Sequence, residues 1–484
     1  MRSKRLSSYL VMAATIAASA TAGAQEATPE PATPAPADAP PPAAAPTPSA
    51  AEAPRLPEDA LRKMIDEQVA KGMAPKVGDV HLHGYFRAGY GTSVEGGRQT
   101  CFQDPGAIYK WRLGNECDLY GEFLFSTPAY VGDNGMVATA NVMFNVYIPT
   151  TTQGYPDGFT AAKNELGRDI HWGTNQFYFD FAGVPFLGQG THAWVGRRFY
   201  KRDNIDTIDY FWWNNSGLGG GIEDIPLGGT VKLSVAAFES DGPGQVQADP
   251  IQPSLPLQNE MGIRPDVRLY GIMVPGGELV LGVNPVLNVS NNNATHGGLS
   301  ATAMHVAHAL GGTNKLAVQY GFGSAVGDNG VFGSLETPTD SNFVRVLDHI
   351  DFQVSPELGG HLIGVFNNYN SFTVNGMTTP ARQGISVGGR VSYALAENAQ
   401  LIADAGFDTV KIDNVDRRNL FKISVAPAIT AGKAFWARPQ LRLFGTLAFW
   451  NAAARAGGVD SAGLYTATNK SVGATFGIQG EAWW

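Results

Sequence analysis

The sequence has little cysteine, little charge and few long apolar runs, and each shortage narrows the class of protein. Only two cysteines, Cys101 and Cys117, occur among 484 residues, which leaves room for a single disulfide. Acidic residues outnumber basic ones by 43 to 34, so there is no electrostatic basis for binding nucleic acid. After the N-terminal region no stretch of about 18 apolar residues occurs, and we expect no membrane-spanning helix.

Signatures of catalysis are also missing. The sequence contains no HExxH metal motif, no GxSxG elbow and no Walker A loop. Its nine histidines show no ligand spacing; His305 and His308 would share a face only in a helix, whereas their segment alternates like a strand. We therefore expect neither an enzyme nor a bound cofactor or metal.

The N-terminal region has the pattern of an exported protein. Residues 1–24 combine basic residues, an apolar segment and the small-residue site Ala22-Gly23-Ala24, which predicts a cleaved signal peptide. Residues 25–57 are rich in proline and alanine and are expected to form an extended, mobile linker. Within residues 58–75, apolar residues recur at helical spacing, which predicts a short helix. Such a helix would pair with its copies as a coiled coil, stand alone, or contact the cell wall.

The remainder of the chain alternates apolar and polar residues with the period of two found in β-strands. In residues 83–90, for example, Phe86 and Tyr90 share one face, whereas Tyr85 and Arg87 share the other. The same alternation recurs, with strands expected, in segments 110–125, 231–235, 315–320 and 441–450.

Alternation fits either a soluble sandwich or a membrane barrel, so the pattern alone does not choose between them. Two features favour the barrel. First, the polar faces of the expected strands include large aromatic residues beside Arg and Glu, as in a lined channel. Second, the chain ends in an aromatic strand, in which Trp484 would face lipid and Trp483 would face the lumen. At roughly 22 residues per strand and connection, residues 79–484 would form about eighteen strands. We predict an all-β, transmembrane antiparallel β-barrel with an inward-folded constriction loop that narrows its wide lumen.

The best candidate for that loop is residues 196–213, GRRFYKRDNIDTIDYFWW, where charged and aromatic residues are concentrated. A surface loop of mixed charge is the alternative. Aromatic and charged side chains together suit sugars, because pyranose C–H faces pack on aromatic rings and hydroxyl groups bond to charged partners. For the cysteine pair, a disulfide closing a local loop is favoured over a zinc site.

Over about residues 80–484 the sequence resembles the maltoporin or sugar-porin family. The resemblance is carried by HGYFRAGYG at 83–91, CFQ-x-x-GA-x-x-K-x-RLGNEC-x-x-Y-x-E at 101–122, the stretch 196–213, RVLDH at 345–349, WARPQLRLF at 436–444 and the terminal EAWW. It implies an eighteen-stranded outer-membrane barrel, a homotrimer, and facilitated diffusion of oligosaccharides along an aromatic slide flanked by an ionic track. The segment before the barrel resembles the N-terminal extension of sucrose porins, which implies a periplasmic location.

The resemblance also assigns roles to individual residues. Pore-lining positions of the first strands would be Tyr85, Arg87, Arg112, Tyr120 and Glu122. Ionic-track positions would be Arg202 and Asp209, Trp483 would belong to the aromatic slide, and Cys101 and Cys117 would form the family's loop disulfide.

Several positions depart from the family pattern. Asn204 replaces an acid, and Phe211 replaces a constricting tyrosine. Two slide aromatics align with Ala301 and with Gly384 or Ile385, and Trp172 is a weak match to the tryptophan that a neighbouring subunit lends. The preferred sugar, maltodextrin-like or sucrose-like, therefore stays open. The alternatives are a non-selective diffusion porin and an envelope anchor acting through the segment before the barrel.

Overall fold

The computed structural model describes residues 76–149, 171–241, 261–289, 295–374 and 376–484. The predicted signal peptide, linker and short helix, at 1–24, 25–57 and 58–75, lie outside the described residues. Within the described part, no helix is both long and apolar enough to cross a membrane.

Strands dominate the described chain. The first barrel strands are β1 (His81–Ser93), β2 (Asp118–Val131), β3 (Val137–Pro149), β4 (His171–Ala182), β5 (His192–Arg198), β8 (Gly217–Gly228), β9 (Val231–Asp241), β10 (Met261–Val274) and β11 (Gly277–Asn288). The others are β12 (Gly298–Ala309), β13 (Gly312–Gly323), β14 (Asn342–Gln353), β15 (Leu358–Tyr369), β18 (Arg382–Ala396), β19 (Ala399–Ile412), β20 (Arg418–Thr430), β21 (Gln440–Trp450) and β22 (Val472–Trp483).

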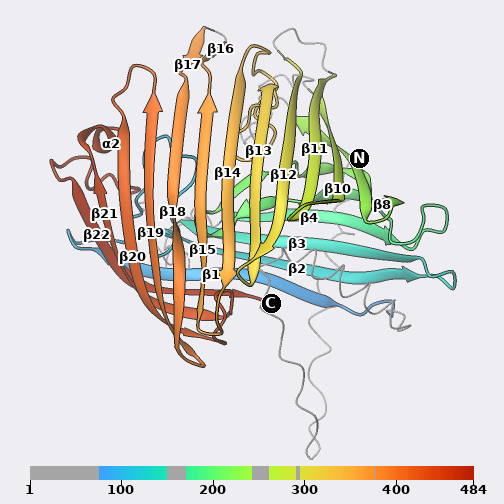
Figure 1. The fold of residues 1–484 in the computed structure, drawn as a ribbon, viewed down its shortest axis with the longest axis horizontal. Coiled ribbons are helices and arrows are strands. Elements are labelled where there is room, and N and C mark those ends of the chain that lie inside the picture. Colours follow the sequence, from blue (N-terminus) through green and yellow to red (C-terminus); the bar gives the residue numbers. More distant parts are fainter. Residues whose placement is uncertain (1–75, 150–170, 242–260, 290–294, 375) are drawn as a thin grey trace, which may run out of the picture. The chain divides into compact units, whose positions relative to one another are not determined.

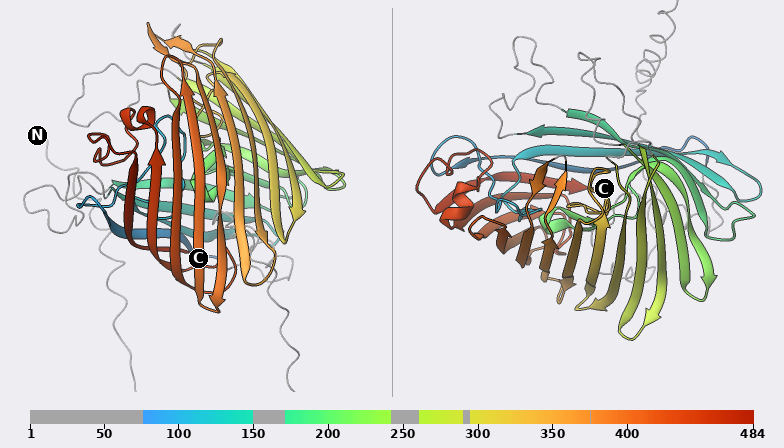
Figure 2. Two further views of the ribbon diagram at one scale, coloured as in Figure 1. Left: turned by 60° about the vertical axis from the view of Figure 1, so that its left-hand side comes forward. Right: turned by 90° about the horizontal axis from the view of Figure 1, so that it is seen from above.

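These strands form one 18-stranded antiparallel sheet. Each strand pairs with its sequence neighbours in the sheet, and β1 pairs with β22, so the sheet closes into a barrel. Figures 1 and 2 show β10 to β15 running side by side in the wall. This closed antiparallel sheet confirms the predicted β-barrel. Closure also pairs the backbone groups that would otherwise be left open at the edges of the sheet, as a membrane requires.

The remaining elements lie in connections between barrel strands. They are β6 (Asp203–Ile205), the 3-10 helix η1 (Asp206–Ile208), β7 (Tyr210–Trp213), the hairpin of β16 (Phe372–Val374) and β17 (Met377–Thr379), and the helix α2 (Ala452–Ala456). Short turns, such as residues 310–311, join strands at one end of the barrel, and long loops, such as 451–471, join them at the other. We call these the short-turn end and the long-loop end.

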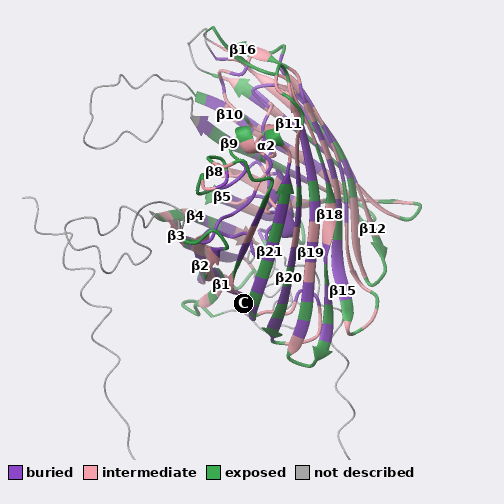
Figure 3. Cartoon of the chain, turned by 90° about the vertical axis from the view of Figure 1, so that its left-hand side faces the viewer, coloured by how far each residue is buried: buried purple, intermediate pink, exposed green. Residues whose placement is uncertain are grey.

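The two faces of the sheet differ as the alternation predicts. Along β21 the outward Leu441 is 45% exposed, whereas its inward neighbour Arg442 is 3% exposed. Figure 3 shows the same alternation of buried and exposed residues along β19 to β21. Apolar side chains are thus outside and polar ones inside, the reverse of a soluble protein and the arrangement of a membrane barrel.

The strand expected over residues 110–125 is wrong in its first half. Segment 110–125 alternates throughout, yet β2 begins only at Asp118, and Trp111 lies in the preceding loop. The Trp111 indole is buried against the inner wall, where a Cβ at Gly406 would lie 1.9 Å from the ring. Its Nε1 donates to the Asp408 carboxylate at 3.1 Å. The space that Gly406 leaves on the inner wall therefore accommodates the Trp111 ring inside the barrel.

Candidate functional site

Residues 199–216, between β5 and β8, cross the interior of the barrel. Trp213 Nε1 donates to Asn284 Oδ1 on β11 at 3.2 Å, and Thr207 Oγ1 lies 3.1 Å from His361 Nδ1 on β15. The carbonyl of Trp212 accepts from the Arg345 guanidinium on β14 at 2.9 Å. Because these partners lie on strands far round the sheet, the segment is the predicted inward-folded loop, although residues 196–198 of the predicted range 196–213 belong to β5. We call residues 199–216 the constriction loop.

A second loop, residues 94–117, folds inward to meet it. Cys101 and Cys117 form the predicted disulfide across this loop. The backbone N–H of Arg112 donates to the carbonyl of Thr207 at 3.1 Å, which joins the two loops. Arg112 therefore lies in this disulfide loop and not on a strand, because β2 starts after Cys117.

Aromatic rings follow one another along the inner wall. The centroid of Tyr85 on β1 lies 6.2 Å from that of Tyr120 on β2. It lies 6.5 Å from Trp483 on β22, with 15° between the ring planes. Each of these rings is half-buried, so part of its surface faces the lumen. We call Tyr120, Tyr85 and Trp483 the aromatic row; the strand register brings it together, since Tyr85 pairs with Trp483.

Trp436 lies behind this row. Its ring centroid is 6.3 Å from that of Trp483, and its side chain is buried. The Arg438 guanidinium lies 4.2 Å from the Trp483 centroid, in a cation–π arrangement. Both residues come from the connection between β20 and β21, and they fix the orientation of Trp483.

Charged side chains border the aromatic row. Arg87 binds Asp118 through two hydrogen bonds of 2.8 and 2.9 Å and lies 4.0 Å from Asp209. Arg112 donates to the Tyr85 hydroxyl at 2.6 Å. Glu122 accepts from the Tyr120 hydroxyl and, at 3.0 Å, from Asn175.

Glu116, in the disulfide loop, pairs with three of the basic side chains near the aromatic row. It pairs with Arg112 and lies 3.1 Å from Lys110 and 3.9 Å from Arg87. Burial alone would raise the pKa of its carboxyl, but the charges of Arg87, Lys110 and Arg112 hold that pKa well below its usual range. Glu116 is therefore ionised at neutral pH and offsets part of the positive charge of these three side chains.

The constriction loop contributes its own aromatic–cation cluster. The Arg202 guanidinium lies 3.5 Å from the Phe199 ring centroid and 4.6 Å from the Phe211 centroid. Asp209 ends η1 in the left-handed conformation, φ 56°, and its side chain is 38% exposed. All the predicted site residues thus lie on or beside the constriction loop, the disulfide loop and strands β1, β2 and β22.

A family model described as "LamB porin" matches residues 80–484. This chain belongs to the LamB porin family. The match covers the whole barrel and agrees with the fold, the inward loops and the outward apolar face.

Among solved structures, this porin is similar to Pseudomonas aeruginosa OpdK with vanillate, at 10% identity and TM-score 0.44, covering 84% of this chain and 100% of that one. It is similar to Acinetobacter baumannii OccAB1, at 8% identity and TM-score 0.46, covering 85% and 97%. A BenF-like porin from Pseudomonas fluorescens matches at 11% identity and TM-score 0.46, covering 84% and 100%. Similarity this low carries no argument about substrate.

The porin also has a buried charge cluster that sequence reasoning missed. Glu481 on β22 accepts from Arg438 at 3.0 Å and Arg112 at 3.3 Å, and also pairs with Arg442. Arg438, Arg442 and Glu481 lie within the motifs WARPQLRLF and EAWW, so their letters were visible, but their convergence depends on pairing between β21 and β22.

The positions that depart from the family pattern face different ways. Ala301 is exposed on the outer face of β12, whereas its neighbours Ser300 and Thr302 are buried inward, so Ala301 cannot line the pore. On β18, Ile385 is exposed outward and Gly384 faces inward. Of these three residues, only Gly384 lies at a position that faces the pore.

Proposed function

We propose that this outer-membrane porin is a carbohydrate-selective channel through which oligosaccharides diffuse passively. The aromatic row beside Arg87 and Arg112 is the observation that supports this most. Each ring can pack on a pyranose C–H face for about 1 kcal/mol, while the charged groups bond to hydroxyls. Several moderate contacts in series let a sugar enter and also leave, which a single deep pocket would not.

The residues divide by chemistry. Rings that would stack on the sugar are Tyr85, Tyr120, Phe211 and Trp483, and groups that would bond to its hydroxyls are Arg87, Arg112, Glu122, Arg202 and Asp209. Substrates would be maltodextrin-like or sucrose-like. No step changes a covalent bond, so no catalytic group or cofactor is required.

We further propose a homotrimer in outer-membrane lipid, with residues 25–75 in the periplasm and in contact with the cell wall. The direction of β1 supports the periplasmic placement. His81 begins β1 at the short-turn end, and short turns are periplasmic in outer-membrane barrels. Residues before β1 would therefore emerge on the periplasmic side.

Single-channel recording tests the proposal. Neutral oligosaccharides should interrupt the ion current with saturable kinetics at millimolar concentrations. A non-selective pore, which the inward Gly384 would favour, would instead show current that scales with ion mobility and no interruption by any sugar. Absence of interruption across maltose, sucrose and longer glucans would overturn the proposal.

A further inference from the structure

The long-loop end holds a group of polar residues that the aromatic row and its charged neighbours do not include. It starts from residues 324–341, the loop between β13 and β14, which docks on the constriction loop. Asn329 Oδ1 accepts from the backbone N–H of Phe211 at 3.0 Å, and Val331 N–H donates to the carbonyl of Asn214 at 3.2 Å. Asn329 and Gly330 therefore lie at a loop tip beside the constriction loop.

Arg345 fixes this arrangement from the wall. Its guanidinium is fully buried and donates to the carbonyl of Trp212 in the constriction loop at 2.9 Å. It also donates to the carbonyls of Gly327 and Asp328, each at 3.0 Å. One side chain thus holds both loops, so the side chains at the tip, Asp328 and Asn329, keep a fixed place next to Phe211.

Asp328 and Arg382 form an ion pair at this tip that is still open to solvent. The Asp328 side chain is 53% exposed and that of Arg382 is 23% exposed. Arg382 opens β18 at the long-loop end, and its guanidinium lies 4.6 Å from the Tyr369 ring centroid. Stacking on Tyr369 orients the guanidinium, while exposure leaves both charged groups accessible to a solute.

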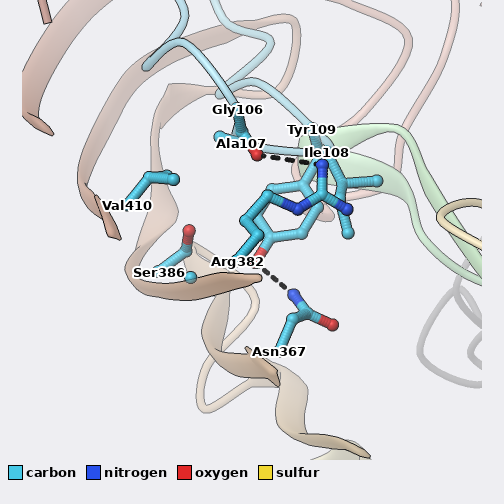
Figure 4. Close-up of a pocket in the computed structure, with 9 residues that line it drawn as sticks. Gly106, Ala107, Ile108, Tyr109, Asn367, Arg382, Ser386 and Val410 are labelled. Atoms are coloured by element: carbon cyan, nitrogen blue, oxygen red, sulfur yellow. Dashed lines mark hydrogen bonds between the residues drawn. The ribbon is translucent and has the colours of Figure 1, made fainter. Parts of the chain in front are cut away.

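The wall next to this pair lacks a ring. A Cβ at Gly384, two residues beyond Arg382, would meet no atom of the described chain within 4 Å. Figure 4 shows the pocket there, with Arg382, Tyr109, Asn367 and Ser386 around it. Arg382 Nη1 donates to the carbonyl of Gly106 at 3.4 Å across its edge. The pocket itself, about 10 Å³ in volume, admits a water molecule and no sugar unit. The exposed polar side chains at its edge are therefore the groups that a sugar can reach, and its lining offers no exposed flat apolar face.

We propose that Arg382, Asp328 and Asn329 form a second sugar subsite, at the long-loop end, which recognises a sugar unit by its hydroxyls and not by a ring face. A guanidinium offers paired donors and a carboxylate paired acceptors, which suits adjacent hydroxyl groups. The class that fits is a neutral oligosaccharide containing a furanose unit, because the five-membered ring presents less flat C–H surface than a pyranose chair while it keeps its hydroxyls for hydrogen bonding. This inference rests on the proposed function and names its substrate class.

Two isomeric disaccharides separate the modes of recognition. Sucrose carries a furanose and maltose does not, although both have the same mass and composition. In the full-length porin, the double variant Asp328→Asn/Arg382→Gln removes both charges; the first change keeps the shape of the side chain, and the second shortens it and removes the guanidinium. We expect its sucrose block constant to weaken about tenfold and its maltose constant to change less than twofold.

The matched control is Glu357→Gln/Lys433→Gln, an ion pair of comparable exposure, 39% and 36%, at the short-turn end. It should leave the sucrose constant unchanged. The converse variant, Gly384→Trp, adds a ring at a wall position where a Cβ would meet no atom of the described chain within 4 Å, and it should tighten maltose block several-fold while leaving sucrose unimproved. Unchanged single-channel conductance of the control, and heat-modifiable gel mobility of every variant, show that the barrels have folded.

The outcomes are distinguishable. If the wild-type porin shows no block by either sugar, the proposed function fails. If it is blocked but the double variant leaves sucrose unaffected, or weakens both sugars equally, the second subsite is overturned and the proposed function stands.

Discussion

The short-turn and long-loop sides of the constriction are built from different chemistry. Towards the short-turn end, Tyr85 and Trp483 present partly exposed rings that buried Trp436 and Arg438 hold in place. Towards the long-loop end, Arg382 and Asp328 present exposed charges beside an empty position at Gly384. A sugar passing through would thus meet a surface that reads ring faces and a surface that reads hydroxyls. Under the proposed function, the barrel would therefore favour a substrate with a furanose unit over a uniform glucan.

The largest expected effect comes from removing Arg345, the residue that holds both loops in place. Arg345→Met would leave the buried carbonyls of Trp212, Gly327 and Asp328 without their donor, at a cost of at least about 3 kcal/mol. Both loops should loosen, so thermal denaturation in detergent should occur at lower temperature and open-channel current noise should rise. Arg417→Met, an exposed arginine in a loop, is the control. Open-channel current noise equal to that of the wild type in the Arg345 variant would refute the role of Arg345 in holding both loops.

A smaller effect is expected from one ring of the aromatic row. Trp483→Ala should weaken maltose block about fivefold, equivalent to about 1 kcal/mol for one stacking contact. The adjacent Trp484 faces outward and is 49% exposed, so Trp484→Ala removes the same ring from the other face. Block should be unchanged in that control. Equal weakening by both variants would mean that barrel stability, and not ring stacking, sets the block constant.

A separate effect, on stability and not on sugar block, concerns how the disulfide loop responds to pH. Asp104 in this loop is fully buried, and neither of its carboxylate oxygens has a hydrogen-bond partner among the described residues. Burial, and then the nearby Asp408, raise its pKa to about 8, although Arg418 opposes the shift. Because the folded pKa exceeds the unfolded value near 3.8, the folded protein binds the extra proton between these pH values. Its stability should therefore fall as pH rises from about 4 to about 8 and level off above.

Asp104→Asn removes this dependence. The variant should melt a few degrees higher than wild type at pH 8, and the difference should shrink towards pH 5. Thermal denaturation in detergent at both pH values measures it. A difference that is independent of pH would show that the carboxyl is not the cause.

The barrel could be predicted from the sequence because every strand of a membrane barrel must alternate between lipid-facing and lumen-facing residues. Adjacent residues such as Trp483 and Trp484 must face opposite ways, and they do so. Segment 110–125 obeyed the rule by coincidence: Trp111 alternates like a lipid-facing residue, yet it packs on an inner glycine gap that pattern cannot reveal. The motif RVLDH contains Arg345, but its role could not be predicted, because its partners are backbone carbonyls in loops distant in sequence.

The most direct measurement is current block by maltose and by sucrose in wild type, Trp483→Ala and Arg382→Gln porins. We predict saturable block of the wild type by both sugars. Trp483→Ala should weaken maltose more than sucrose, and Arg382→Gln should weaken sucrose more than maltose. Absence of block in the wild type, or equal weakening of both sugars in both variants, would contradict a channel with two unlike sides.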